Sequence, residues 1–320
     1  VDWKADVWVN DIKVGQHTGG FTPFSFNITP YLNGKSNQKL VVRVWDPSDR
    51  GYQPRGKQTS RPEGIWYTPV TGIWQTVWLE PVAAGHITSI KAIPNIDTNI
   101  MNVTVGTSCN CPSGIVEVKL LDKGQVVASA KGISGKELRL VVQNPNLWSP
   151  SDPYLYDMKV SLSKDGKILD EVKSYTAFRK ISAARDKDGI MRMCLNNKPL
   201  FQYGPLDQGW WPDGLYTAPT DEALLYDIQK TKDWGFNMIR KHVKVEPARW
   251  YYHCDKEGIL VWQDMPSGDM GNNWQPHVYG GGTDKERTPE SIANYYQEWK
   301  EIMDFCMSNP SVVTWVPFNE

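Results

Sequence analysis

Side chains suited to acid–base chemistry follow three apolar segments in the C-terminal part of the sequence. Arg240 and His242 close the segment NMIRKH, Asp264 follows ILVWQ, and Asn319 and Glu320 follow SVVTWVPF. A carboxyl group can donate and accept a proton during bond cleavage, while Arg and Asn side chains hold carboxylates or substrate hydroxyls by hydrogen bonds. These residue types would form a hydrolytic site if the fold placed the ends of the segments side by side.

Strand and helix patterns alternate from about residue 181 onward and would bring those ends together. Short apolar runs that end at turn or polar residues predict four strands, at 199–204, 237–242, 259–265 and 311–320. Helices are expected between them, one capped by Thr220 and one that begins at Pro289 after its cap Thr288. Buried strands that alternate with helices predict a parallel sheet, here the first half of a (β/α)8 TIM barrel.

Active sites of such barrels lie at the C-terminal ends of the strands. This rule selects one short set of residues, in strand order: Tyr203 and Gly204, Arg240 and His242, Asp264, Asn319 and Glu320.

The sequence before residue 181 has the period-two patterns of antiparallel strands. In residues 1–82 these patterns are separated by Gly, Pro and Asn clusters, and the first pattern already starts at Val1, so we expect further strands to precede it. Residues 83–180 contain two tight hairpins, at Lys123–Gly124 and Asp165–Gly166, and fit an immunoglobulin-like β-sandwich. No residue there suggests chemistry, and we expect a structural spacer.

Composition excludes several classes of protein. The 35 basic and 36 acidic residues give a net charge of −1, which argues against a nucleic-acid partner. No run approaches the roughly 18 apolar residues that suggest a membrane-spanning helix. Five cysteines, among them Cys109 and Cys111, and five scattered histidines lack metal or redox spacing, so neither a metal nor a cofactor is expected. The 15 Trp residues suit sugar stacking or core packing, and for any single Trp the core is favoured.

Four motifs, in order along the whole chain, resemble glycoside hydrolase family 2, the group of β-galactosidases, β-glucuronidases and β-mannosidases. VDWKADVWVNDIKVGQHTGGFTPFSFNIT and TPVTGIWQTVWLEPV resemble the sugar-binding jelly roll of that family, NPNLWSPSDPYLYDMKV its immunoglobulin-like domain, and NPSVVTWVPFNE its fourth barrel strand. The resemblance implies three domains: a partial jelly roll at 1–82, an immunoglobulin-like sandwich at 83–180, and the N-terminal half of a catalytic TIM barrel at 181–320.

The resemblance also implies a retaining exo-glycosidase for terminal β-linked sugars, with β-galactosidase as the expected specificity. Glu320 matches the general acid and base, which protonates the leaving oxygen and later activates water. Asn319 matches the residue that hydrogen-bonds the sugar 2-hydroxyl. Arg240 matches an arginine that orients a catalytic carboxylate, and its alternative is a purely structural ion pair.

Three further positions depart from the family pattern. His242 stands one place earlier than the His of the usual Ser–His pair, so it either touches sugar or lies on a solvent-facing loop. Asp264 stands where relatives carry Glu, Asp or a substrate-contacting His. The jelly-roll position that often sends an acid into the active site, six before Gly72, is Trp66, and Glu63 is its nearest substitute.

A retaining mechanism needs a second carboxylate, about 5–5.5 Å from the first. The acids Glu301 and Asp304 lie on a predicted helix, so the nucleophile is expected beyond residue 320 and this chain alone is expected to be inactive. The alternatives are β-glucuronidase or β-mannosidase specificity, a non-catalytic carbohydrate-binding protein, or an inactive relative that serves as a scaffold. A homo-oligomer stays open, and a secreted or periplasmic location is compatible with the full-length protein.

Overall fold

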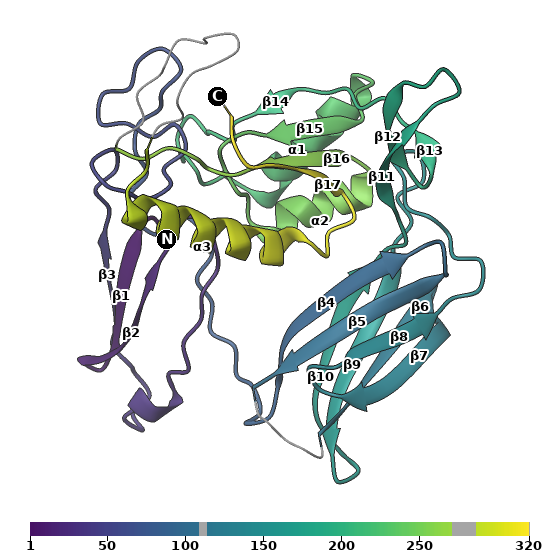
Figure 1. Ribbon diagram of the computed structural model, residues 1–320. Helices are drawn as coiled ribbons and strands as arrows, with labels where there is room; N and C mark the ends of the chain where they lie inside the picture. The colour runs from purple at the N-terminus through teal and green to yellow at the C-terminus, as the bar shows by residue number, and fades with distance from the viewer. Residues whose placement is uncertain (109–113, 271–285, 320) are drawn as a thin grey trace.

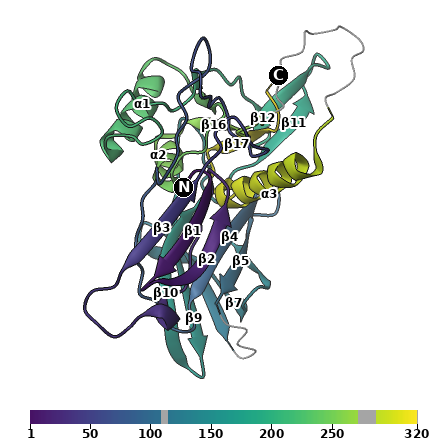
Figure 2. The ribbon, with the colours of Figure 1, turned by 90° about the vertical axis from the view of Figure 1, so that its left-hand side faces the viewer.

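Strands make up most of the regular structure in the computed structural model, which describes residues 1–108, 114–270 and 286–319. Two antiparallel β regions lie on the same side of a layer that contains the α-helices, as Figure 1 and Figure 2 both show. None of the helices in these described ranges is both long and apolar enough to cross a membrane.

The first region is a three-stranded antiparallel sheet with the order β2-β1-β3, formed by Lys4–Val9 (β1), Ile12–Thr18 (β2) and Leu40–Trp45 (β3). A short 3-10 helix, η1 (Thr29–Tyr31), lies between β2 and β3. The connections between the strands of this region are long and rich in turns, as the sequence predicted. The segment that follows β3 runs over the carboxyl end of the parallel sheet, where Arg55 N donates to Gly268 O at 3.2 Å.

The second region consists of two antiparallel sheets that enclose one apolar core. The three-stranded sheet has the order β4-β5-β8, with bounds Ile87–Asn95, Ile100–Thr107 and Glu137–Val141. The four-stranded sheet has the order β10-β9-β6-β7, with bounds Lys167–Thr176, Tyr156–Lys164, Ile115–Asp122 and Gln125–Ile133. Both predicted hairpins are confirmed, because Lys123–Gly124 and Asp165–Gly166 adopt the positive φ angles of a tight turn.

A parallel sheet and three helices form the last region, beyond a small antiparallel sheet of β11 (Ile181–Arg185), β12 (Met191–Leu195) and β13 (Lys198–Pro199). The parallel strands follow the chain order: β14 Leu206–Asp207, β15 Met238–Lys241, β16 Leu260–Asp264 and β17 Val312–Val316. The helices lie between them in sequence: α1 Asp221–Asp233, α2 Ala248–Glu257 and α3 Pro289–Cys306. The predicted alternation of strand and helix is therefore confirmed.

Local chemistry sets the helix ends. The side chain of Thr220 accepts a hydrogen bond from Ala223 N at 3.1 Å, and that of Thr288 accepts one from Ser291 N at 3.2 Å, so both predicted N-caps are confirmed. Gly258 ends α2 in the left-handed conformation, which favours glycine because it has no Cβ.

The strand predicted at 199–204 is wrong. β13 ends at Pro199 and pairs with β12, and the first parallel strand is β14, only two residues long. Gly204 lies so close to the start of β15 that a Cβ atom on it would be 1.6 Å from Met238 O. Tyr203 exchanges hydrogen bonds with Asn237, which precedes β15, so both residues lie at the amino end of the sheet.

Alternate residues of the parallel strands enter two different cores. Ile239, Val261 and Val312 pack with the helices in one apolar cluster. That cluster also contains Phe21, Val70 and Trp74 from the N-terminal region, which therefore shares its core with the helical layer. The neighbouring strand residues Met238, Leu260 and Val313 pack on the other face of the sheet. Their partners are Trp148 and Ala177 at the end of the second β region and Leu195 of β12.

Candidate functional site

Four of the predicted site residues meet at the carboxyl end of the parallel sheet. Arg240 forms a two-pronged ion pair with Asp264, with Nε 3.0 Å from Oδ1 and Nη2 2.8 Å from Oδ2. The same Nη2 donates to Asn319 Oδ1 at 3.0 Å. His242 Nδ1 lies 2.6 Å from Asp264 Oδ2. The Asp264 carboxylate thus binds both Arg240 and His242, and Arg240 links them to Asn319, 79 positions away in sequence.

The parallel register explains why these side chains meet. Arg240 lies opposite Trp262 on β16, and Asp264 lies opposite Val316 on β17, so the strands end at nearly the same level. Backbone bonds continue past the strand ends, with His242 N donating to Asp207 O at 2.8 Å and Met265 N donating to Val316 O at 2.9 Å.

Burial makes this cluster strongly ordered. The side chain of Asp264 is 2% exposed and that of Arg240 is 27% exposed, so the carboxylate depends on its partners for solvation. Planar, two-pronged bonds between a guanidinium and a carboxylate fix both groups in orientation as well as in distance. His242 is also buried, at 2% exposure, which excludes the alternative of a solvent-facing loop residue.

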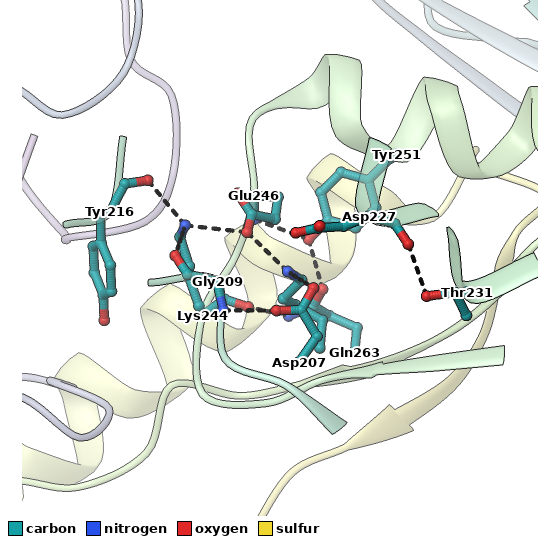
Figure 3. A network of polar contacts seen from close by, with 10 residues as sticks. Asp207, Gly209, Tyr216, Asp227, Thr231, Lys244, Glu246, Tyr251 and Gln263 are labelled. Carbon is teal, nitrogen blue, oxygen red and sulfur yellow. Dashed lines mark hydrogen bonds and ion pairs between the residues drawn. The ribbon is translucent and has the colours of Figure 1, made fainter. Parts of the chain in front are cut away.

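A second polar network lies beside this cluster and is drawn in Figure 3. Lys241 Nζ lies 2.6 Å from Asp207 Oδ2 and 2.8 Å from Glu246 Oε1. Lys244 Nζ lies 3.1 Å from the same Glu246 oxygen and donates to the backbone oxygens of Gly209 and Tyr216. Two lysines and a carboxylate are therefore almost fully buried together, a costly arrangement that only mutual pairing makes tolerable.

The two buried lysines have opposite pKa shifts. Burial alone would lower the pKa of Lys241, but the carboxylates of Asp207 and Glu246 outweigh it and raise that pKa above its usual value. Burial lowers the pKa of Lys244, which Glu246 offsets only in part. The pKa of Asp207 is lowered, because Lys241 outweighs the opposing effect of burial. Lys241 is thus the firmly charged centre of the network.

Loop 242–247 joins the two clusters. Val243 has φ 52°, a strained conformation for a β-branched residue. Its neighbours are held from both sides, because Gln263 Nε2 donates to Lys244 O at 2.8 Å and Tyr251 OH donates to the Gln263 side chain at 2.5 Å. The buried network thereby fixes the backbone that carries His242.

The remaining predicted residues do not join the cluster. Tyr203 and Gly204 lie at the opposite end of the sheet, because the first strand starts later than predicted. Glu63 lies in an exposed loop, and within the described residues no hydrogen bond or ion pair of the cluster reaches it. Glu320 lies outside the described residues.

Sequence reasoning missed the whole Lys241 network. Asp207 was missed because the first strand was placed too early, which moved its carboxyl end to Tyr203 and Gly204. The segment RKHVKVEP could have indicated this network. Lys241, Lys244 and Glu246 are charged residues at the end of a buried strand, and buried charges must form ion pairs.

Within the described ranges, no group of His, Cys, Asp and Glu is arranged to hold a metal ion. Cys194, Cys254 and Cys306 are buried thiols. The predicted uninformative pair Cys109 and Cys111 lies outside the described residues.

Comparison with known proteins finds similarity to glycoside hydrolases. Residues 85–179 match the family model for Glycosyl hydrolases family 2. A putative β-glucuronidase of Formosa agariphila is 26% identical over 100% of this chain, and a β-galactosidase of Thermoanaerobacter pseudethanolicus is 27% identical over 85% of it. The chain is therefore similar to glycoside hydrolases along its length, and to the family 2 model in its middle part.

Solved structures of two β-glucuronidases share the fold. The β-glucuronidase of Ruminococcus gnavus superposes with a TM-score of 0.81 at 20% identity, over 100% of this chain and 53% of that one. The β-glucuronidase of Bacteroides uniformis superposes with a TM-score of 0.75 at 25% identity, over 98% and 37%. The chain spans 37% of the length of each of the two curated family 2 relatives named above.

Proposed function

We propose that this chain is part of a retaining exo-glycosidase that hydrolyses terminal β-linked sugars, with β-galactosides as its substrates. The observation that carries the proposal is the buried Arg240–Asp264–His242 cluster, which holds Asn319 immediately before Glu320. An acid-bearing strand end supported in this way suits a carboxyl group that must keep one position through two proton transfers.

Asn319 is the clearest substrate-binding group. Arg240 can only donate hydrogen bonds, so the atom of Asn319 that faces its Nη2 is the amide oxygen. The amide NH2 group then points away from the arginine and can donate to a sugar hydroxyl. In the proposed mechanism it binds the 2-hydroxyl, a contact that strengthens as positive charge develops on the sugar ring.

Asp264 supports the site and does not react. Both of its oxygens are engaged by Arg240, and one of them also by His242. The proposed chemistry is divided between Glu320, as general acid and base, and a nucleophilic carboxylate beyond residue 320. Covalent attack by the nucleophile releases the leaving group, which Glu320 protonates, and Glu320 then takes a proton from the water that hydrolyses the intermediate.

We assign the three regions of the chain to the domains of such an enzyme. Residues 1–82 form the sugar-binding jelly-roll domain, residues 83–180 an immunoglobulin-like spacer, and residues 181–320 the first half of the catalytic (β/α)8 barrel. The parallel order β14-β15-β16-β17 and the position of the Arg240 cluster at the carboxyl strand ends support the barrel assignment.

A second candidate specificity is for β-glucuronides. It is supported by the solved structures above, both of which are β-glucuronidases. Full-length protein tested on nitrophenyl β-galactoside and β-glucuronide separates the two specificities. Turnover of neither, and none of nitrophenyl β-mannoside, would contradict the proposed reaction class and favour a carbohydrate-binding or scaffold role.

Replacing Glu320 by Gln in the full-length protein tests the acid role. General acid–base catalysis typically contributes about 10²–10⁴-fold, and a good leaving group needs no protonation. We therefore expect kcat/KM, which reports the bond-breaking step, to fall by about that factor for a methyl β-glycoside and far less for a dinitrophenyl β-glycoside. The exposed Glu222→Gln is the matched control and should leave both rates unchanged. Equal losses on both substrates for Glu320→Gln would refute the assignment.

Residues 1–320 expressed alone should show no turnover of nitrophenyl β-glycosides, because the proposed nucleophile is not among them. The measurement is release of nitrophenol, with the full-length protein as the positive control. Activity of the short chain above background would show that the reaction does not need a carboxylate beyond residue 320.

A further inference from the structure

The segment that follows β17 has no strand partner. The last pair of the β16–β17 ladder joins Asp264 and Val316, and within the described part of the chain no backbone–backbone hydrogen bond reaches residues 317–319. Pro317 also lacks a backbone N–H and cannot donate to a neighbouring strand. Other contacts must therefore fix the position of Asn319.

Helix α3 lies beside β17 (Figure 1) and supplies two aromatic contacts to the strand and its continuation. Tyr295 and Trp299 are four residues apart, so they lie on one face of the helix. Trp299 meets Trp315 of β17 edge to face, with ring centroids 5.6 Å apart. Tyr295 stacks on Phe318, with ring centroids 5.4 Å apart and planes 9° from parallel. The same helix face therefore holds both the strand and the segment beyond it.

The hydroxyl of Tyr295 adds a directed contact, because it donates a hydrogen bond to Pro317 O. Burial raises the pKa of this hydroxyl to about 12, so it keeps its proton and can donate at neutral pH. Two residues further along the chain, Arg240 Nη2 donates to Asn319 Oδ1 at 3.0 Å. Residues 317–319 are thus held at one end by Tyr295 and at the other by Arg240.

We propose that Tyr295 is a positioning residue for the candidate active site. Its hydroxyl and its ring fix residues 317 and 318, and thereby set the direction in which the amide group of Asn319 meets the sugar 2-hydroxyl. The contact with Arg240 is not sufficient for this, because a single hydrogen bond fixes a distance better than an orientation. This inference rests on the proposed glycosidase function and adds to it a residue that lies on a helix, away from the strand ends.

Tyr295→Phe in the full-length protein tests this role, because it removes the hydrogen bond and keeps the ring. The substrates are a dinitrophenyl β-glycoside and its 2-deoxy analogue, which differ only in the hydroxyl that Asn319 would bind. Their leaving group needs no protonation, so a shift of the neighbouring Glu320 does not affect the bond-breaking step. We expect kcat/KM to fall about tenfold for the glycoside and far less for the 2-deoxy analogue, so that the ratio of the two values falls.

The double variant Tyr295→Phe with Asn319→Ala distinguishes positioning from a general structural effect. Once the amide group is absent, Tyr295→Phe should not lower the ratio any further, because the two changes act on one contact. Tyr296→Phe is the matched control and should keep the wild-type ratio. Tyr296 is the next residue on α3, is 68% exposed, and makes no hydrogen bond through its hydroxyl within the described ranges.

An unchanged ratio in Tyr295→Phe would overturn the positioning role and leave the glycosidase function intact, whether or not the thermal unfolding midpoint falls. A ratio that falls again when Tyr295→Phe is added to Asn319→Ala would also overturn it, because Tyr295 would then act independently of Asn319. Failure of the wild-type protein to cleave either substrate would remove the glycosidase function and the role of Tyr295 with it.

Discussion

Arg240 and Lys241 are adjacent on β15 and serve two different clusters, because successive strand residues point to opposite faces. Arg240 reaches Asp264 and Asn319 at the rim, while Lys241 turns to Asp207 and Glu246 and lies over the ring of Trp250, 4.4 Å from its centre. The rim cluster supplies groups for chemistry, and the buried one fixes the loop that carries His242. The short strand β15 thus contributes both to the candidate site, through Arg240, and to the buried network that holds the loop beside it, through Lys241.

Lys241→Met tests the contribution of the buried ion-pair network to stability. Without the ammonium group, Asp207 loses its ion-pair partner and Glu246 keeps only Lys244, and removing one partner of a buried ion pair typically costs about 3–5 kcal/mol. We expect a clear fall in the thermal unfolding midpoint, measured by calorimetry. Lys230→Met, which removes a surface pair with Asp233, should leave the midpoint unchanged.

The double variant Lys241→Met with Asp207→Leu distinguishes stranded charge from lost packing, because Glu246 keeps its pairing with Lys244. Removing the second charge should restore part of the midpoint if uncompensated carboxylate is the cause. A double variant no more stable than Lys241→Met would contradict that account.

The residues of the site could be predicted because active sites of parallel sheets lie at the carboxyl ends of the strands, and the strand ends can be read from the sequence. Arg240, His242, Asp264 and Asn319 were found from the ends of three apolar runs, and the structure brings these four together. What could not be predicted is which partners they choose. That Asp264 is shared by Arg240 and His242 depends on side-chain contacts of 2.6 to 3.0 Å, which spacing in sequence does not contain. Glu63 shows the same limit, since a loop has no period to fix its direction.

At the scale of elements, long periodic segments were predicted well and the shortest one was not. The helices α1, α2 and α3 have caps and apolar stripes that identify them. β14 has two residues and no pattern of its own, and it becomes a strand only because β15 offers partners for Leu206 and Asp207. The segment before β14 approaches the start of β15 closely at Gly204, which lies against the backbone of Met238.

Gly204→Ala tests that packing. A Cβ atom would meet Met238 O at 1.6 Å, and because that oxygen belongs to the backbone of β15, relief requires the two segments to separate. We expect a loss of about 3 kcal/mol or more in the free energy of unfolding. The control is Gly34→Ala, where no atom lies within 4 Å and only the positive φ is unfavourable, at a cost of about 1 kcal/mol. Equal losses in the two variants would show that the close approach is not a constraint.

At the scale of the whole molecule, one carboxylate connects the second β region to the helical layer. Asp255 on α2 accepts from Tyr175 OH on β10 at 2.8 Å, from Asn309 Nδ2 at 2.7 Å and from Ser311 N at 2.8 Å. Its backbone oxygen accepts from Trp148 Nε1 at 2.7 Å. Polar contacts of Asp255 therefore join the second β region to the helical layer. The sequence pattern of either region alone could not predict these contacts, because each pattern describes only its own segment.

The charge of Asp255 should make this connection sensitive to pH. Complete burial raises its pKa to about 6, and the hydrogen bonds from Ser311, Asn309 and Tyr175 counteract this only in part. In the unfolded chain the pKa of Asp is about 3.9, so between pH 4 and 6 the folded protein binds the extra proton. Its contribution to stability is therefore present at pH 4 and is lost as pH rises to 6, by roughly 3 kcal/mol.

Asp255→Asn removes this titration, and comparison with the wild type cancels the other groups that titrate in the same range. We expect the difference between the two thermal unfolding midpoints to favour the wild type most at pH 4 and to shrink steadily toward pH 6.5. Asp304→Asn, at an exposed position on α3, should show a difference that is small and nearly constant. A wild-type advantage that grows with pH would mean that Asp255 is ionised in the folded protein throughout, held by its three donors. The joint between the two regions would then be strongest in neutral solution.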